Sequence, residues 1–290
     1  MHQVGVWHDH EAALRDASRI GAQYGLHDLQ LQALDVEHQM PQALESENWL
    51  IVNFSVPRIE KRSLKATRIS VIIDKTQAVT IHAPDMEIMS HIHDRIALTP
   101  RISSSPTGVL AIVADVVTEQ FTPVLDYVDE AIDRIEEAMI KHPEEKQQYQ
   151  LFHYKKILVD FRRIVLPTTA VLDALSDGRH QMIDKKYATY LRDSYDYAWR
   201  AHDLTDNLRD LLASALDTYQ SIVSNRMNDV MKRLTVVTTV FMPISFLVGF
   251  GGMNFTHLPF GDDWAFWGLM ILIVLMPAAM LWYFKLRKWL

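Results

Sequence analysis

The sequence predicts an α+β membrane protein in which a soluble domain precedes a hairpin of two membrane-spanning helices. Two stretches near the C-terminus, 234–250 and 264–284, are apolar and carry no charged residue. Short β-branched runs in the first hundred residues predict a small sheet. Apolar residues at heptad spacing from Leu125 onward predict long packed helices.

The composition limits the classes of function. The chain has 290 residues, no cysteine and a formal net charge of -7. Without cysteine, disulfides and thiolate metal sites are excluded. The acidic balance argues against nucleic acid as a partner and suits an attraction for cations, although a solvated acidic surface also explains it. The N-terminus has no basic leader and no apolar core, so we expect no signal or transit peptide.

The first hundred residues are expected to form a mixed α/β layer. Three short runs rich in β-branched residues are separated by Pro57 and by charged turns, which is typical of strands. These runs are 49–56, 68–73 and 78–82. Apolar residues at three-and-four spacing predict helices over 10–24 and 85–98, on either side of the sheet.

From Val109 onward the strand signal ends, and long helices are expected. Two segments carry apolar heptads and are separated by His142 and Pro143, which predicts an antiparallel helical pair. The heptad positions are Leu125, Val128, Ile132, Ile135 and Met139, then Leu151, Tyr154, Leu158, Phe161 and Val165. A third helix should begin near Asp184 and run unbroken into the first span. No phosphate loop, nucleophile elbow or HExxH pattern occurs, so no enzyme active site is visible.

The C-terminal hairpin is long enough to cross a bilayer. Segment 264–284 has 21 residues, and at about 1.5 Å per residue it covers the roughly 30 Å hydrocarbon core. A buried hairpin inside a soluble protein is the alternative. Basic residues flank the outer ends of the hairpin and acidic ones lie in its loop, so both termini should face the cytoplasm. The basic residues are Lys232, Arg233, Lys285, Arg287 and Lys288, and the acidic ones are Asp262 and Asp263.

One face of the first span differs from the Val and Phe positions around it. Its small, polar and methionine side chains recur at three-and-four spacing, which places them on one side of a helix. They are Asn228, Met231, Thr235, Thr238, Met242, Ser245 and Gly249. Such residues ordinarily pack transmembrane helices together. The sharper hypothesis is a pore lining, which needs several copies around an axis because one hairpin cannot enclose water.

In the pore hypothesis, Met231 and Met242, with Leu234 beside them, form apolar rings that stop flow by dewetting. Mg²⁺ holds its waters tightly, so amide and hydroxyl oxygens can guide it without stripping its hydration shell. Asn254 in the external loop offers such an amide oxygen, and Gly252 permits the backbone turn that aims it. An ordinary turn also contains Asn near Gly, so this tripeptide alone is a weak signal.

Four motifs occur in order around the two spans, and together they resemble the CorA family of divalent-cation channels. The motifs are NDVMKRLT at 228–235, FMP at 241–243, GMNF at 252–255 and KWL at 288–290. The resemblance extends upstream through 192–196 and 224–228 and, more loosely, to 27–35. It therefore covers nearly the whole chain.

The resemblance implies a homopentamer in a bacterial or archaeal cell membrane. It implies a cytoplasmic α/β funnel domain at 1–183, a stalk helix at 184–233 and a transmembrane hairpin at 234–290. It also implies Mg²⁺ influx driven by the membrane potential, through a pore lined by the first span. The stripe residues and Leu234 become the pore lining, and three residues become the external ion entrance: Gly252, Met253 and Asn254.

The resemblance further implies a gate. Cytoplasmic Mg²⁺ would bind acidic residues between subunits and hold the pore closed, and Asp193 stands at the position of one such carboxylate. Its acidic partner across the interface is left unassigned. The alternative for Asp193 is a solvated helix residue paired with Arg192 or another neighbour.

Two positions depart from the family pattern and bear on the ion. Gly251 stands where the family usually has Tyr, and His257 lies in a loop that is acidic in the family. Imidazole favours Co²⁺, Ni²⁺ or Zn²⁺ over Mg²⁺. Co²⁺ and Ni²⁺ are therefore kept as further transported ions. Two alternative functions are also kept: a zinc-transporting member of the same superfamily and a non-conducting membrane scaffold of the same fold. The intact Met253 favours Mg²⁺, and the aligned polar stripe argues against a scaffold.

Overall fold

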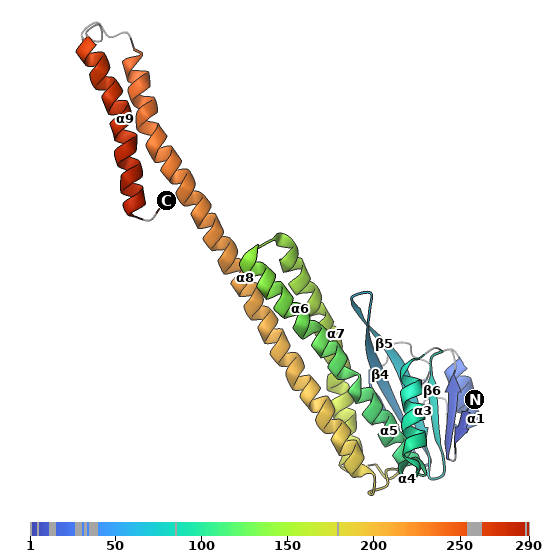
Figure 1. The fold of residues 1–290 in the computed structure, drawn as a ribbon. Coiled ribbons are helices and arrows are strands. Elements are labelled where there is room, and N and C mark those ends of the chain that lie inside the picture. The colour runs from blue at the N-terminus through green and yellow to red at the C-terminus, as the bar shows by residue number, and fades with distance from the viewer. Residues whose placement is uncertain are drawn as a thin grey trace. The chain divides into compact units, whose positions relative to one another are not determined.

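The computed structural model describes residues 2–4, 6–11, 16–26, 31, 34, 40–84, 86–178, 180–253, 263–287 and 289 (Figure 1). The chain divides into two compact units, Met1–Leu216 and Asp217–Leu290. The helix α8, Ala188–Gly251, contributes residues to both. The boundary between the units falls within the predicted stalk, so the three-part division at 184 and 234 stays a prediction.

The first unit contains a sheet with the strand order β1-β2-β6-β5-β4-β3 among its described residues. The pairing of β2 with β6 is parallel, and the other pairings are antiparallel. The strands are β1 His2–Val4, β2 Trp7–Glu11, β3 Gln42–Glu45, β4 Leu50–Glu60, β5 Ser63–Ile73 and β6 Ala78–His82. The three predicted strands are confirmed as β4, β5 and β6.

Strand β4 continues beyond Pro57, where the sequence suggested that it ends. Pro57 pairs with Ala66 of β5. On its other side, β4 pairs with β3 only as far as Asn53. Among the described residues, Pro57 is paired on the β5 side alone, and a residue without a backbone N–H is tolerated at such an edge. As a result, β4 and β5 form a long hairpin that turns at Lys61 and Arg62, both with positive φ.

The helix predicted over 10–24 is wrong in its first part, because β2 extends to Glu11; the helix α1 is shorter, Ala17–Gln23. The strand was missed because a charged residue, Asp9, is buried within it. The Asp9 carboxylate accepts hydrogen bonds from Thr80 and, at 3.0 Å, from His93 Nε2, and it lies 3.4 Å from His82 Nε2. Burial alone would raise the pKa of Asp9, but its bonds to His82 and Thr80 hold that pKa below its usual value.

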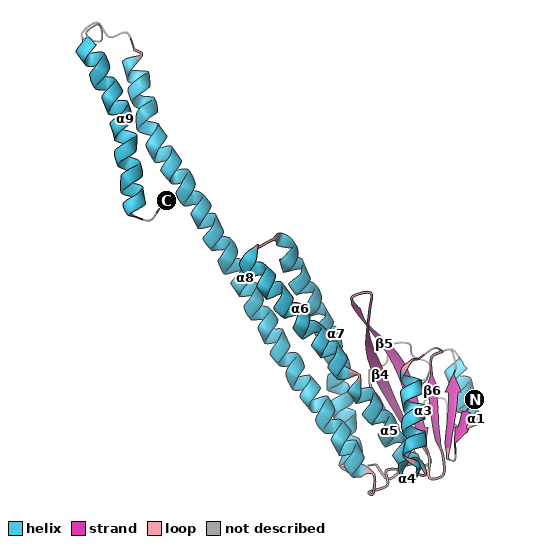
Figure 2. Cartoon of the chain, in the orientation of Figure 1, coloured by secondary structure: helices cyan, strands magenta, loops and turns pink. Residues whose placement is uncertain are grey.

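Helices cover the sheet and extend beyond it (Figure 2). The helix predicted over 85–98 is confirmed as α3, Ile88–Leu98. It is followed by α4 Pro100–Ser103, α5 Pro106–Glu119, α6 Phe121–Lys141 and α7 Glu145–Ser176. The stretch Pro106–Lys141 is long and apolar enough to span a membrane, but 72% of its most apolar window is buried inside the protein. It is therefore a core element of the soluble unit.

The predicted heptads form the contact between α6 and α7. All five heptad residues of α6 are buried, and so are Leu151, Leu158, Phe161 and Val165 of α7. Tyr154 is half-buried. The edge of the Phe121 ring packs on Phe161, with the ring centres 5.6 Å apart. The helix α6 ends at Lys141, next to the break that the sequence predicts at His142. A capping box at Glu144 starts α7.

The predicted third helix is confirmed as α8, which begins at Ala188 rather than near Asp184. The Asp184 carboxylate instead accepts the backbone N–H of Lys186, at 2.9 Å, in the turn before the helix. In the second unit α8 continues through Pro243 to Gly251, and α9 covers Asp263–Leu286. Both helices are long and apolar enough to cross a membrane.

Candidate ion path and regulatory site

The two apolar helices of the second unit lie antiparallel, side by side (Figure 1). At one end, a Cβ placed on Gly251 would lie 2.9 Å from Leu269 of α9, so the glycine permits a close approach of the helices. At the other end, Trp289 lines a cavity of about 550 Å³ together with Asn228 and Thr235 of α8. Part of the hairpin therefore lies beside α8 at each end, and between these ends the buried Val236 and Val240 mark the covered side of α8.

The covered side and the predicted stripe are on opposite faces of α8. Val236 and Val240 are buried, at 3% and 7% exposure, whereas Met231 and Met242 are exposed at 55% and 67%. At about 100° per residue, the centre of the stripe lies about 150° from the direction shared by the two valines. The other stripe positions and Leu234 are exposed as well. From Thr238 to Gly249 the stripe is therefore exposed, whereas its first part, Asn228, Met231 and Thr235, lines the cavity beside Trp289.

The two threonines of the stripe present acceptor oxygens to their surroundings. Thr235 donates its hydroxyl hydrogen to the carbonyl oxygen of Met231 at 2.8 Å, and Thr238 donates to that of Leu234 at 2.9 Å. With the hydrogens used within the helix, the lone pairs on the hydroxyl oxygens stay available. Waters bound to a cation turn their hydrogens outward, so these oxygens suit a hydrated cation.

The tip of the hairpin is described only as far as Met253, which is exposed. Gly252 donates its N–H to the Val248 carbonyl at 3.0 Å, and a Cβ there would lie 3.3 Å from that oxygen. The small size of Gly252 thus allows the chain to close tightly on the end of α8. Asn254 and His257 lie outside the described residues, so the ion entrance stays a prediction from the sequence.

Asp193 lies at the edge of a small cavity in the first unit. The cavity, of about 210 Å³, is lined by residues of α3, α5 and α8, including Arg95, Asp115, Tyr190 and Asp193. Arg95 donates to Asp115 at 2.7 Å and to Glu119 at 2.9 Å. A cation from α3 thus holds two carboxylates of α5, and Asp193 adds a third carboxylate from α8.

Asp115 is an acidic neighbour of Asp193 within the same chain, and the partner of Asp193 across the subunit interface stays unassigned. Burial and the negative charge of Glu119 raise the pKa of Asp115, Asp193 raises it further, and Arg95 opposes them. A single charged residue inside the apolar run from Val109 to Val117 is the sequence signal that could have identified it. Excess negative charge of this kind attracts a cation.

Within the described part of the chain, no group of three or more His, Asp or Glu side chains is arranged to hold a metal ion. The Arg95 cluster provides two carboxylates that are already paired and a third, Asp193, beside them. A cation site at Asp193 would therefore need either water ligands or a ligand from a second copy of the chain.

The chain is similar to known proteins over nearly its whole length. The family model described as CorA-like Mg²⁺ transporter protein matches residues 2–287. The chain belongs to this CorA-like family. It is therefore a member of a transporter family and not of an enzyme family, and the resemblance noted in its motifs is confirmed.

Individual relatives agree with the family. The cobalt/magnesium transport protein CorA of Thermotoga maritima is 29% identical over 279 residues, which cover 94% of this chain and 79% of that protein. The zinc transport protein ZntB of Yersinia pseudotuberculosis is 22% identical over 228 residues, covering 75% of this chain and 69% of that protein. The similarity to the zinc transporter is thus weaker and shorter.

The fold matches that of a complete CorA structure. The CorA magnesium transporter of Methanocaldococcus jannaschii superposes with a TM-score of 0.85 at 21% identity, covering 98% of this chain and 91% of that one. This likeness confirms the predicted fold, in which an α+β domain with long helices is joined by one long helix to a C-terminal helical hairpin. The assignments of the stripe, the tip and Asp193 stay predictions.

Proposed function

We propose that five copies of this chain assemble around an axis into a channel that admits Mg²⁺ to the cytoplasm, with Co²⁺ and Ni²⁺ as further ions. One observation carries the proposal. From Thr238 to Gly249 the stripe of α8 is exposed and lies opposite the buried Val236 and Val240, so in a ring of hairpins this part can face a shared axis while α9 stays outside. Membership of a Mg²⁺ transporter family supports the ion.

The stripe has properties that a path for hydrated Mg²⁺ requires. It contains no carboxylate that would bind the ion tightly, and its threonine oxygens are acceptors. Met231, Leu234 and Met242 are exposed apolar side chains that would form narrow rings in an assembly. Such rings close by dewetting when they narrow, so they would serve as the gate.

The proposed regulation places Asp193 and Asp115 at a cytoplasmic cation site shared between neighbouring copies. Burial raises the pKa of Asp115 most, and the negative charges of Glu119 and Asp193, which a bound cation would offset, raise that pKa further. The positive-inside rule supports a cell membrane protein with two spans and both termini in the cytoplasm, with the loop containing Asn254 outside.

Transport is tested by measuring Mg²⁺, Co²⁺, Ni²⁺ and Zn²⁺ uptake into liposomes that contain the purified chain. We expect Mg²⁺ uptake, reduced about tenfold or more by Asn254→Ala, because a charge-assisted contact is lost from every subunit at once. Asn207→Ala is the matched control, since Asn207 is an exposed amide on α8 whose side chain donates a hydrogen bond to the nearby Asp203 at 3.4 Å.

Uptake of Zn²⁺ but not Mg²⁺ would favour the zinc-transporting alternative, which the similarity to ZntB and the external His257 support. Equal Mg²⁺ uptake by the native chain and Asn254→Ala would remove the role given to Asn254. No uptake of any of the four ions would favour a non-conducting scaffold of this fold.

A further inference from the structure

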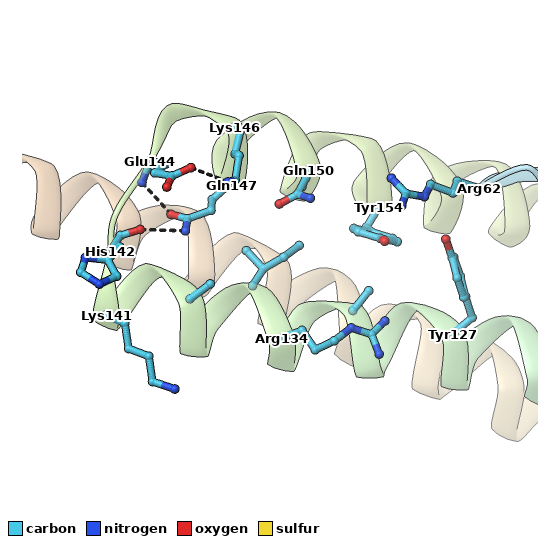
Figure 3. A pocket seen from close by; sticks show the side chains of 13 residues that line it. Arg62, Tyr127, Arg134, Lys141, His142, Glu144, Lys146, Gln147, Gln150 and Tyr154 are labelled. Atoms are coloured by element: carbon cyan, nitrogen blue, oxygen red, sulfur yellow. Dashed lines mark hydrogen bonds and ion pairs between the residues drawn. The ribbon is translucent and has the colours of Figure 1, made fainter.

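A groove of about 620 Å³ lies between α6 and α7 near the turn that connects them, away from Asp193 and its cavity (Figure 3). Its floor is made by small and apolar side chains of α6, including Ala131 and Ile135. Cationic and polar side chains form its walls: Arg62, Arg134, Lys141, Lys146, Gln150 and Tyr154. The groove therefore combines an apolar base with several cations.

The turn of the β4–β5 hairpin brings Arg62 to this groove. Lys61 and Arg62 occupy the turn with φ of 48° and 66°, a left-handed conformation that non-glycine residues rarely adopt. The ring of His153 on α7 donates from Nε2 to the Arg62 carbonyl oxygen at 2.6 Å. This contact fixes the turn on α7, and the guanidinium of Arg62 points toward Tyr154 (Figure 3).

The side chains of Arg62 and Arg134 lie on opposite sides of the groove, near a pair of tyrosines (Figure 3). The rings of Tyr127 and Tyr154 lie 5.8 Å apart. Burial and the hydrogen bond with Tyr127 raise the pKa of Tyr154, while the positive charges of Arg134 and Arg62 act in the opposite direction. Both guanidiniums are thus within electrostatic reach of the same phenol. An anion placed between the two arginines would be attracted by both positive charges.

The carboxylates nearby do not neutralise this end of the groove. Glu144 is the only carboxylate among the described lining residues, and it is held by Lys146 at 2.5 Å and by the cap of α7. Arg134 pairs with Glu130 at 3.3 Å, but both side chains are more than 60% exposed, and such surface pairs are weak. Among the described residues, no ion pair involves Arg62.

We propose that this groove binds a phosphate-bearing anion, gripped by Arg62 and Arg134 and extended toward Lys141 and Lys146. Guanidinium groups pair with phosphate oxygens through two parallel hydrogen bonds, and lysines add point charges. The tyrosine hydroxyls can donate to the same oxygens. The volume falls in the range of small-ligand sites. The anion is either a soluble diphosphate or triphosphate or the headgroup of an anionic lipid.

The turn itself provides a matched pair of variants. Arg62→Gly removes the guanidinium, and its backbone suits a positive φ better than arginine does, so the hairpin should fold at least as well. Lys61→Gly removes one positive charge from the same turn at the same kind of φ, but Lys61 does not line the groove. Comparing the two variants separates the effect of removing one positive charge from the turn from the effect of removing a residue that lines the groove.

The test uses the full chain in detergent and Mg²⁺-free buffer, with calorimetric titration of inorganic pyrophosphate and, separately, of dihexanoyl phosphatidic acid. We expect saturable binding of at least one probe, about tenfold weaker in Arg62→Gly and unchanged in Lys61→Gly. If pyrophosphate binds and only Arg62→Gly weakens its binding, the ligand is a soluble phosphate compound. If phosphatidic acid alone binds in this way, the ligand is a lipid headgroup. No saturable binding of either probe, or equal weakening in both variants, would overturn the proposal.

Discussion

The electrostatic surroundings of Asp193 are set by charged residues of α3 and α5. Arg95 of α3 holds Asp115 and Glu119 of α5, and the negative charge of Asp193 reaches Asp115 from α8. The surroundings already contain one cation for three carboxylates. An added divalent cation would therefore meet excess negative charge, as the regulatory role predicted for Asp193 requires.

Removing Asp193 should weaken the response of the cytoplasmic part to Mg²⁺. We expect millimolar Mg²⁺ to protect the native chain from trypsin. Asp193→Ala should raise the concentration for half-protection by about tenfold, equivalent to about 1.4 kcal/mol. Gel densitometry of the intact chain across a Mg²⁺ series measures the shift.

Asp196→Ala is the control for this experiment, because Asp196 is an exposed carboxylate one turn further along α8 and pairs with Arg192 at 3.6 Å. It should leave the half-protection concentration unchanged. The same shift in both variants, or none in Asp193→Ala, would return Asp193 to its alternative as a solvated residue.

Among the elements, the junction of α4 and α5 is the tightest described contact made by a glycine. A Cβ placed on Gly108 would lie 1.9 Å from the Ile102 carbonyl oxygen and 2.7 Å from its carbonyl carbon. Backbone atoms cannot rotate away as a side chain does, so any other residue must separate α4 from α5. Ile102 also lines the Asp193 cavity, so this junction supports the candidate regulatory site.

Gly108→Ala should destabilise the soluble unit by about 1–3 kcal/mol, the usual cost of forcing extra atoms into a packed interior. The midpoint of thermal unfolding, measured on the full chain in detergent, should fall accordingly. Gly268→Ala serves as the control, because a Cβ at Gly268 meets no atom within 4 Å. Identical midpoints for the two variants would contradict the close contact at Gly108.

The elements that the sequence predicted best are those with a regular apolar period. The heptads of α6 and α7 identified their contact surface, and the charge-free runs identified both helices of the hairpin. Strand β2 escaped prediction because the charge on Asp9 is compensated by His82, Thr80 and His93, which lie at least 71 positions away. Pairing over such distances leaves no local pattern.

Some parts of the candidate site follow from spacing along one helix and could be predicted, whereas others depend on packing between distant segments and could not. The stripe on α8 follows from spacing along one helix, and the structure adds that the opposite face is covered. The closeness of Asp115 to Asp193 depends on how α5 packs near α8, which no local spacing encodes. The groove that contains Arg62 likewise requires a hairpin turn and two helices to come together.

At the scale of the whole molecule, the central claim is that copies of α8 surround a Mg²⁺ path with their stripes inward. The chain has no cysteine, so single cysteines can be introduced without a background. Thr238 belongs to the exposed stripe, whereas Val240, two positions along, is buried on the covered face. The two positions therefore compare opposite faces at nearly the same depth.

The most direct measurement is Mg²⁺ uptake into liposomes by Thr238→Cys and Val240→Cys, before and after a membrane-impermeant, positively charged methanethiosulfonate reagent. We predict that the reagent reduces uptake by Thr238→Cys about tenfold, because it places a fixed cation in the path, and leaves uptake by Val240→Cys unchanged. Equal inhibition of both variants, or uninhibited uptake by Thr238→Cys after confirmed labelling, would contradict the claim that the stripe lines the path.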